Sequence, residues 1–246
     1  MTRHRDFEIQ LENFRNESAI AAQYTYAEMA IQHAASKSQK LLNRLNYTPR
    51  FWIVCGASLQ TAAYISLGRI FDTKSNYNVN ALLDSMEQNL NIFQHSALAM
   101  RKREGKATDP AWLSDYLKQA YVPRDKDVAR LRTMVAKYRL IYERAVKPAR
   151  NKYLAHREKE KYEDVKALFA GGTTRELCRL TTFLLQLNNI LWQQLHNGRR
   201  PVFYPNRHSV KSIYDAKQTS TAPHESIVAD VKKLMHLIAK ATPDIP

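Results

Sequence analysis

The residues of this sequence best suited to chemistry are an arginine and a histidine, Arg150 and His156, in a basic segment. An imidazole can give or take a proton at neutral pH. A guanidinium keeps its charge and matches the phosphate oxygens of a phosphoryl-transfer transition state. Together they could cleave RNA without a metal, so we predict that both are catalytic. The competing interpretation is an interior histidine beside a surface arginine, because this spacing also arises by chance.

A long basic helix, about 124–161, is expected to position this pair. Its apolar residues follow a three-four spacing: Val128, Leu131, Val135, Tyr138, Tyr142, Ala145 and Ala149. Lys152 and His156 continue that register, which places His156 on the packed seam. Arg150 lies about 9 Å along an ideal helix from His156, so both side chains can converge on one phosphate. Pro148 predicts a kink or a helix restart immediately before Arg150.

One arginine and one histidine make a minimal catalytic site. Two such pairs that face each other across a homodimer would supply a fuller one. We therefore expect a composite site that exists only where two chains meet.

Positive charge is concentrated around the same helix. The chain of 246 residues has a net charge of +15, and residues 101–161 contain 18 Lys and Arg against 8 Asp and Glu. Residues 1–100 are nearly neutral, with 9 against 8. A concentrated positive field attracts polyanions, so nucleic acid is the expected partner. A basic face that serves only solubility is the alternative, and no aromatic-tipped amphipathic anchor favours a membrane surface.

The composition predicts an all-α fold, because 6 Gly and 9 Pro are too few for the many tight corners of a sandwich or barrel. Apolar periodicity predicts helices at about 7–45, 51–71, 79–103, 110–120, 124–161, 173–196 and 223–241. Asp109 and Pro110 are expected to begin the short fourth helix. We predict an up-and-down four- to five-helix bundle over residues 1–197, with an inserted helical pair at about 79–122. A basic loop and a C-terminal amphipathic helix follow over 198–246.

The second predicted helix, 51–71, is apolar nearly all round, and we expect it to be the buried centre of the bundle. Its polar side chains make it a poor membrane span: Ser58, Gln60, Thr61 and Ser66. Cys55 and Cys178 lack the spacing of a disulfide framework or a zinc site, and the N-terminus has no apolar signal segment. A cytoplasmic protein without metal or cofactor is expected.

The segment Arg150-Asn151-Lys152-Tyr153-Leu154-Ala155-His156 resembles the signature of the HEPN superfamily, in which Arg, a polar residue and a short spacer precede His. Together with Leu67-Gly68-Arg69-Ile70-Phe71-Asp72, it is similar to the abortive-infection U branch. The resemblance covers about residues 15–197. It implies a helical bundle, a homodimer that apposes the two motifs, and metal-independent endoribonuclease activity in phage defence or toxin–antitoxin systems. It also implies a nucleotidyltransferase-like antitoxin as partner.

By this match Arg150 and His156 are the catalytic residues. The residues that follow Arg150 would support them: Asn151, Lys152 and Tyr153. Arg69 and Asp72 would line the same cleft, or form a salt bridge that ends their helix.

Two functions of different class are therefore open. The first is a HEPN ribonuclease toxin. The second is a non-catalytic helical module that binds nucleic acid or a partner protein through its basic helix. The basic, aromatic loop 199–204 would either cradle an RNA backbone or pack its rings on the bundle.

Overall fold

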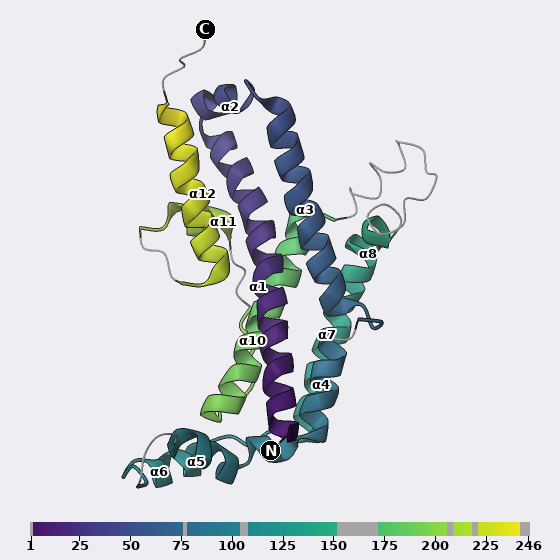
Figure 1. Ribbon diagram of the computed structural model, residues 1–246, viewed down its shortest axis with the longest axis vertical. Coiled ribbons are helices and arrows are strands. Elements are labelled where there is room, and N and C mark those ends of the chain that lie inside the picture. Colours follow the sequence, from purple (N-terminus) through teal and green to yellow (C-terminus); the bar gives the residue numbers. More distant parts are fainter. Residues whose placement is uncertain are drawn as a thin grey trace. The chain divides into compact units, whose positions relative to one another are not determined.

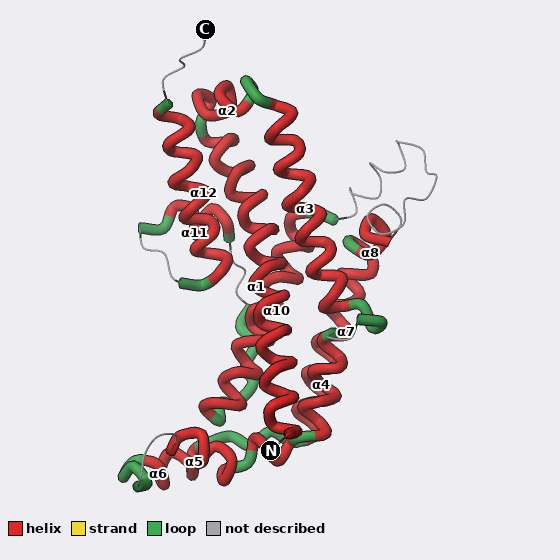
Figure 2. Tube along the Cα trace, in the orientation of Figure 1, coloured by secondary structure: helices red, strands yellow, loops and turns green. Residues whose placement is uncertain are grey.

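The computed structural model describes residues 2–75, 78–103, 108–151, 172–205, 209–217 and 221–241. Within these ranges every regular element is a helix, which confirms the predicted all-α class (Figures 1 and 2). The chain forms two compact units, each assembled from segments distant in sequence. Unit 1 comprises Met1–Ser18, Arg69–Tyr142 and Phe183–Pro205, and unit 2 comprises Ala19–Gly68, Glu143–Thr182 and Asn206–Pro246.

Three predicted helices lie where the apolar periodicity placed them: α3 (Pro49–Phe71), α10 (Thr174–Asn197) and α12 (Pro223–Lys240). The first predicted helix is instead divided into α1 (Thr2–Lys37) and α2 (Gln39–Leu45). The hydroxyl of Ser38 accepts a hydrogen bond from the backbone N–H of Leu41 at 3.2 Å and so starts α2. A short helix within the predicted C-terminal loop, α11 (Val210–Asp215), was not expected.

The predicted helix 79–103 is also divided, into α4 (Val79–Gln88), the 3-10 turn η1 (Leu90–Phe93) and α5 (His95–Arg103). The next helix, α6, spans Leu113–Gln119 and begins after Trp112. Asp109 is therefore not its N-cap, and that prediction was wrong. The carboxylate of Asp109 instead accepts a hydrogen bond from the guanidinium of Arg103 at 2.7 Å.

The basic helix breaks close to the predicted position. Helix α7 spans Asp125–Ala145, and α8 (Lys147–Ala149) restarts the chain with Pro148 in its first turn. The single helix predicted over 124–161 is thus wrong at Val146, while the break that Pro148 predicted is confirmed. Six of the seven predicted seam residues are buried, and Tyr138 is half-buried. The seam therefore packs within the chain.

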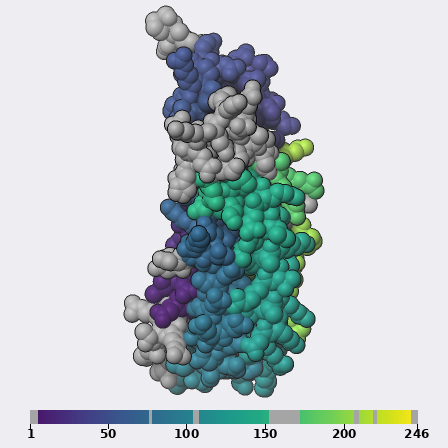
Figure 3. Space-filling model, turned by 90° about the vertical axis from the view of Figure 1, so that its right-hand side faces the viewer, coloured from purple at the N-terminus to yellow at the C-terminus, as the bar shows by residue number. Residues whose placement is uncertain are grey.

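Aromatic contacts hold unit 1 together. The rings of Tyr138 on α7 and Phe183 on α10 stack at 4.0 Å between centroids. Arg132 on α7 forms ion pairs of 2.7 Å with both Asp84 and Glu87 on α4. Figure 3 shows α4 (blue) and α7 (teal) side by side on one face. Unit 1 thus fixes α7 against α4 and α10.

In unit 2 the ring of Tyr26 on α1 is buried against His224 of α12, 5.4 Å away. The first half of α3 departs from the prediction, because its apolar side chains are largely exposed rather than central. Helix α3 is long and apolar enough to cross a membrane, and 28% of its most apolar window is buried. One such helix is weak evidence for a membrane span.

Asp127, near the start of α7, contributes to the stability of unit 1. This buried carboxylate accepts hydrogen bonds from the phenol of Tyr121 at 2.6 Å and from the backbone N–H of Arg124 at 2.9 Å. We expect Asp127→Ala to lower the free energy of unfolding by about 1–3 kcal/mol, because two donors lose their acceptor. Urea unfolding followed by circular dichroism measures this change. The exposed Asp125→Ala is the matched control, and equal effects of both variants would contradict the role of Asp127.

Candidate active site

Arg150 follows α8 directly, where its backbone N–H donates to the carbonyl of Val146 at 3.0 Å. Val146 and Ala149 are fully buried, whereas Arg150 is half-buried. The backbone widens to π-helical geometry at Arg150 and Asn151. Single π turns inside helices are frequent at functional sites. The break at Val146 and the buried residues of α8 together fix the backbone from which the Arg150 side chain extends.

The side chain of Arg150 lies across Gly68 of α3. A Cβ atom added at Gly68 would approach Cδ of Arg150 to 2.6 Å and Cζ to 2.8 Å, and would overlap Nε. Real Cβ atoms essentially never show contacts below 3.0 Å. A larger residue at position 68 would therefore displace the Arg150 side chain from this position.

Asn151 supports the guanidinium, since its Oδ1 accepts a hydrogen bond from Nη1 of Arg150 at 3.3 Å. The sequence resemblance implied this role, and the contact is consistent with it. Lys152, Tyr153 and His156 lie outside the described residues.

A second arginine near the break is held by an acid. Arg144 forms an ion pair of 2.5 Å with Glu176, which also exchanges hydrogen bonds with Thr173 in a capping box at the start of α10. Burial acts to raise the pKa of Glu176, but the hydrogen bonds from Arg144 and Thr173 outweigh it and hold that pKa below its usual value. Arg144 is thus committed to a structural contact.

Tyr64 of α3 lies in unit 2, as Arg150 does, and is fully buried. Burial raises the pKa of its phenol to about 12, against a hydrogen bond from Gln60 that lowers it. The phenol is therefore protonated at neutral pH. A Cβ atom at Gly172 would overlap the Tyr64 hydroxyl and lie 3.0 Å from the carbonyl oxygen of Ala145. The chain thus passes close to Tyr64 at Gly172.

The other two predicted cleft residues have partners in unit 1. Arg69 forms an ion pair with Glu17 of α1 at 3.0 Å. Asp72 ends α3 by accepting a hydrogen bond from the backbone N–H of Lys74 at 3.0 Å. Both contacts belong to the close of the helix, and a role of Arg69 and Asp72 in a cleft stays a prediction.

Sequence reasoning missed Gly68, although it quoted the segment that contains it. A glycine inside an otherwise helical pattern destabilises the helix by about 1 kcal/mol relative to alanine. Such a glycine can be a sign of close packing, as at Gly68, but Gly56 in the same helix has open space around it. What the sequence does not indicate is which side chain, distant along the chain, occupies the space.

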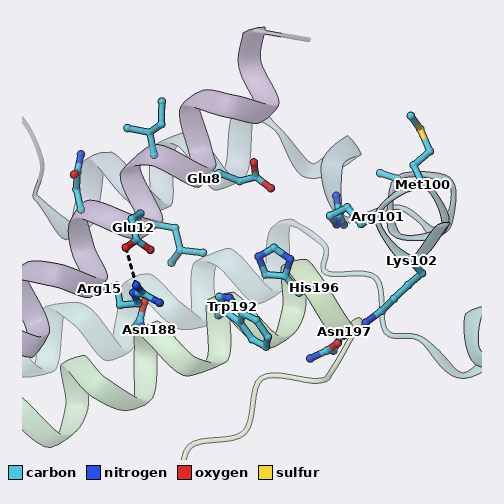
Figure 4. Close-up of a pocket in the computed structure, with 14 residues that line it drawn as sticks. Glu8, Glu12, Arg15, Met100, Arg101, Lys102, Asn188, Trp192, His196 and Asn197 are labelled. Atoms are coloured by element: carbon cyan, nitrogen blue, oxygen red, sulfur yellow. Dashed lines mark hydrogen bonds and ion pairs between the residues drawn. The ribbon is translucent and has the colours of Figure 1, made fainter. Parts of the chain in front are cut away.

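Unit 1 contains a groove of about 1250 Å³ between α1, α5 and α10. Figure 4 shows the side chains around it, which include Glu8, Glu12, Arg15, Arg101, Trp192 and His196. The rings of Trp192 and His196 lie 4.7 Å apart, and Glu12 pairs with Arg15 at 2.8 Å. Among the predicted site residues that the structure describes, none lines this groove. Because it combines carboxylates with cations, its charge does not favour a polyanion.

The loop at 199–204 was predicted either to contact an RNA backbone or to pack its rings on the bundle. Phe203 packs on Phe183, with 5.8 Å between ring centroids. Arg200 lies over the ring of Tyr121 at 5.4 Å, and the carbonyl of Tyr204 accepts a hydrogen bond from Gln186. Four of the six loop residues are exposed: Arg199, Arg200, Val202 and Tyr204. Phe203 thus packs on unit 1, while most of the loop is exposed.

Among the residues that the structure describes, no three His, Cys, Asp or Glu side chains gather in a way that could hold a metal ion. Residues 5–218 match the family model described as AbiU2, a HEPN family. No curated protein and no solved structure is significantly similar to the chain.

The two glycines of α3 provide a matched test of the Arg150 contact. A Cβ at Gly56 would meet nothing within 4 Å. We expect Gly56→Ala to stabilise the fold by up to about 1 kcal/mol, from helix propensity alone. Gly68→Ala should gain less than Gly56→Ala, because the added methyl group displaces the Arg150 side chain from its contact with α3. Urea unfolding of both variants measures the difference, and equal stabilisation would refute the close approach of Arg150.

Proposed function

Because the chain belongs to the AbiU2 family of HEPN proteins, we propose that it is a metal-independent endoribonuclease of abortive infection, a phage-defence toxin. Its site is composite and forms across a homodimer. A nucleotidyltransferase-like antitoxin restrains it, and it acts in the cytoplasm. The observation that carries this proposal is the position of the Arg150 side chain. Gly68 leaves space for it, and Oδ1 of Asn151 accepts a hydrogen bond from the guanidinium.

In the proposed reaction the ribose 2′-oxygen attacks the neighbouring phosphorus. The bond from O2′ to phosphorus forms as the bond from phosphorus to O5′ breaks, leaving a 2′,3′-cyclic phosphate and a 5′-hydroxyl. One proton leaves the 2′-hydroxyl and one reaches O5′, and His156 transfers protons at one or both positions. Arg150 stabilises the negative charge that develops on the phosphorane oxygens.

The surplus of ten positive charges in residues 101–161 supports RNA as the substrate. The same surplus supports the competing function, a non-catalytic module that binds nucleic acid or a partner protein. The two differ in one respect, since a binding module keeps RNA intact. Loss of the catalytic groups therefore separates them.

We expect Arg150→Ala to lower RNA cleavage by about 10²–10³-fold, because the developing charge loses its donor. His156→Ala should lower it by about 10²–10⁴-fold through loss of proton transfer. Gly68→Ala should approach the loss of Arg150→Ala although it keeps the arginine, whereas Gly56→Ala should retain full activity. The measurement is the rate of cleavage of cellular RNA in EDTA, with RNA affinity determined in parallel.

Three results would contradict the ribonuclease. The wild type could leave RNA intact, His156→Ala could cleave as fast as the wild type, or EDTA could abolish the activity. Undiminished RNA affinity together with intact RNA would favour the binding module.

A further inference from the structure

The first half of α3 presents an apolar face to solvent. Phe51, Ile53 and Val54 are 58%, 70% and 62% exposed, and Ile65 further along is 37% exposed. No charged residue occurs from Phe51 to Gly68. Contiguous exposed apolar patches beyond a few hundred Å² are rare on monomers and mark interaction sites. This face, defined by these four residues, needs a partner.

The face has the register of a helix-pairing seam. The residues along one stripe of α3 are spaced alternately three and four apart: Phe51, Val54, Ser58, Thr61, Ile65 and Gly68. That alternation keeps one stripe of a helix turned towards a partner helix. Gly68 lies within about 40° of Val54 around an ideal helix. Because Arg150 covers Gly68, the apolar face leads directly to the proposed catalytic arginine.

From this register we infer that the α3 face is where a second copy of this chain docks. Two copies with a net charge of +15 repel each other over most of their surfaces. Repulsion is smallest where an uncharged stretch meets its own copy. An acidic partner would be recognised by lysines and arginines rather than by a face without charge.

The size of the face fits this occupant. A standard interface takes about 800 Å² from each partner. Together with Tyr47, which is 65% exposed, the four residues of the face expose on the order of 500 Å². Smaller exposed neighbours such as Ala57 and Ser58 add to that area. The face thus supplies most of an interface.

Two copies of α3 that run in the same direction about a two-fold axis pair identical residues. Val54 then faces its own copy, and the two Arg150 side chains meet at the end of the seam. Two guanidiniums repel unless an anion such as a phosphodiester lies between them. This dimer would bring together the two halves of the proposed composite site. Only its purpose depends on the proposed ribonuclease function.

The oligomeric state tests the α3 face directly. We expect the wild type to have the mass of two chains by light scattering without RNA, and Val54→Glu to have the mass of one. Leu140 is 68% exposed on α7, so Leu140→Glu is the matched control and should stay dimeric. Unchanged helical circular dichroism and melting temperature in Val54→Glu separate loss of the dimer from loss of the fold.

A disulfide tests the direction of the two helices. In the full chain with Cys55→Ser and Cys178→Ser, we expect Val54→Cys to form a linked dimer on mild oxidation and Leu140→Cys not to. A monomeric wild type, or a dimer that survives Val54→Glu, would overturn the inference. Absence of the Val54→Cys link in a dimer that Val54→Glu dissolves would overturn the parallel arrangement. A monomer that binds phosphatidylglycerol vesicles through Val54 would assign the face to a membrane instead.

Failure of this inference and failure of the ribonuclease are distinguishable, because mass and RNA cleavage are measured separately. A dimer that leaves RNA intact contradicts the proposed function and retains the α3 face. A monomer that cleaves RNA retains the ribonuclease activity and contradicts both the α3 face and the composite site.

Discussion

The absence of a side chain at Gly68 is the constraint on which the candidate site depends. A residue with even one more carbon at this point of α3 would collide with Arg150. The buried residues of α8 hold the backbone before Arg150, and its side chain occupies the space that Gly68 leaves. Two helices far apart in sequence thus define the position of one cation, and Asn151 completes its support.

The charged residues of the chain are unevenly distributed along the sequence. Basic residues are concentrated in 101–161, whereas α3 carries no charge between Phe51 and Gly68. A stretch without charge, separate in sequence from the basic one, lets two copies associate while each keeps its attraction for a polyanion. Association and substrate attraction therefore use different residues of one chain.

Much of this arrangement was predictable from the sequence. The apolar spacing located α3, α10 and α12, and Pro148 indicated the break before Arg150. The sequence did not predict the exposure of α3, because an apolar helix looks the same whether its partner is its own chain or another. Nor did it predict the capping of α2 by Ser38, or the contact of Gly68 with Arg150, which depends on tertiary packing. The contact of Asp72 with Lys74 is local, whereas the partner of Arg69 is Glu17 on α1, which local pattern does not identify.

The central claim is that one catalytic site needs both chains. Its most direct test is the RNA cleavage rate of wild type mixed with His156→Ala after subunit exchange. At equal amounts, a composite site that needs both histidines should retain about one quarter of the wild-type rate, because only wild-type pairs are active. A rate of about one half would mean that each chain works independently, and would contradict the account.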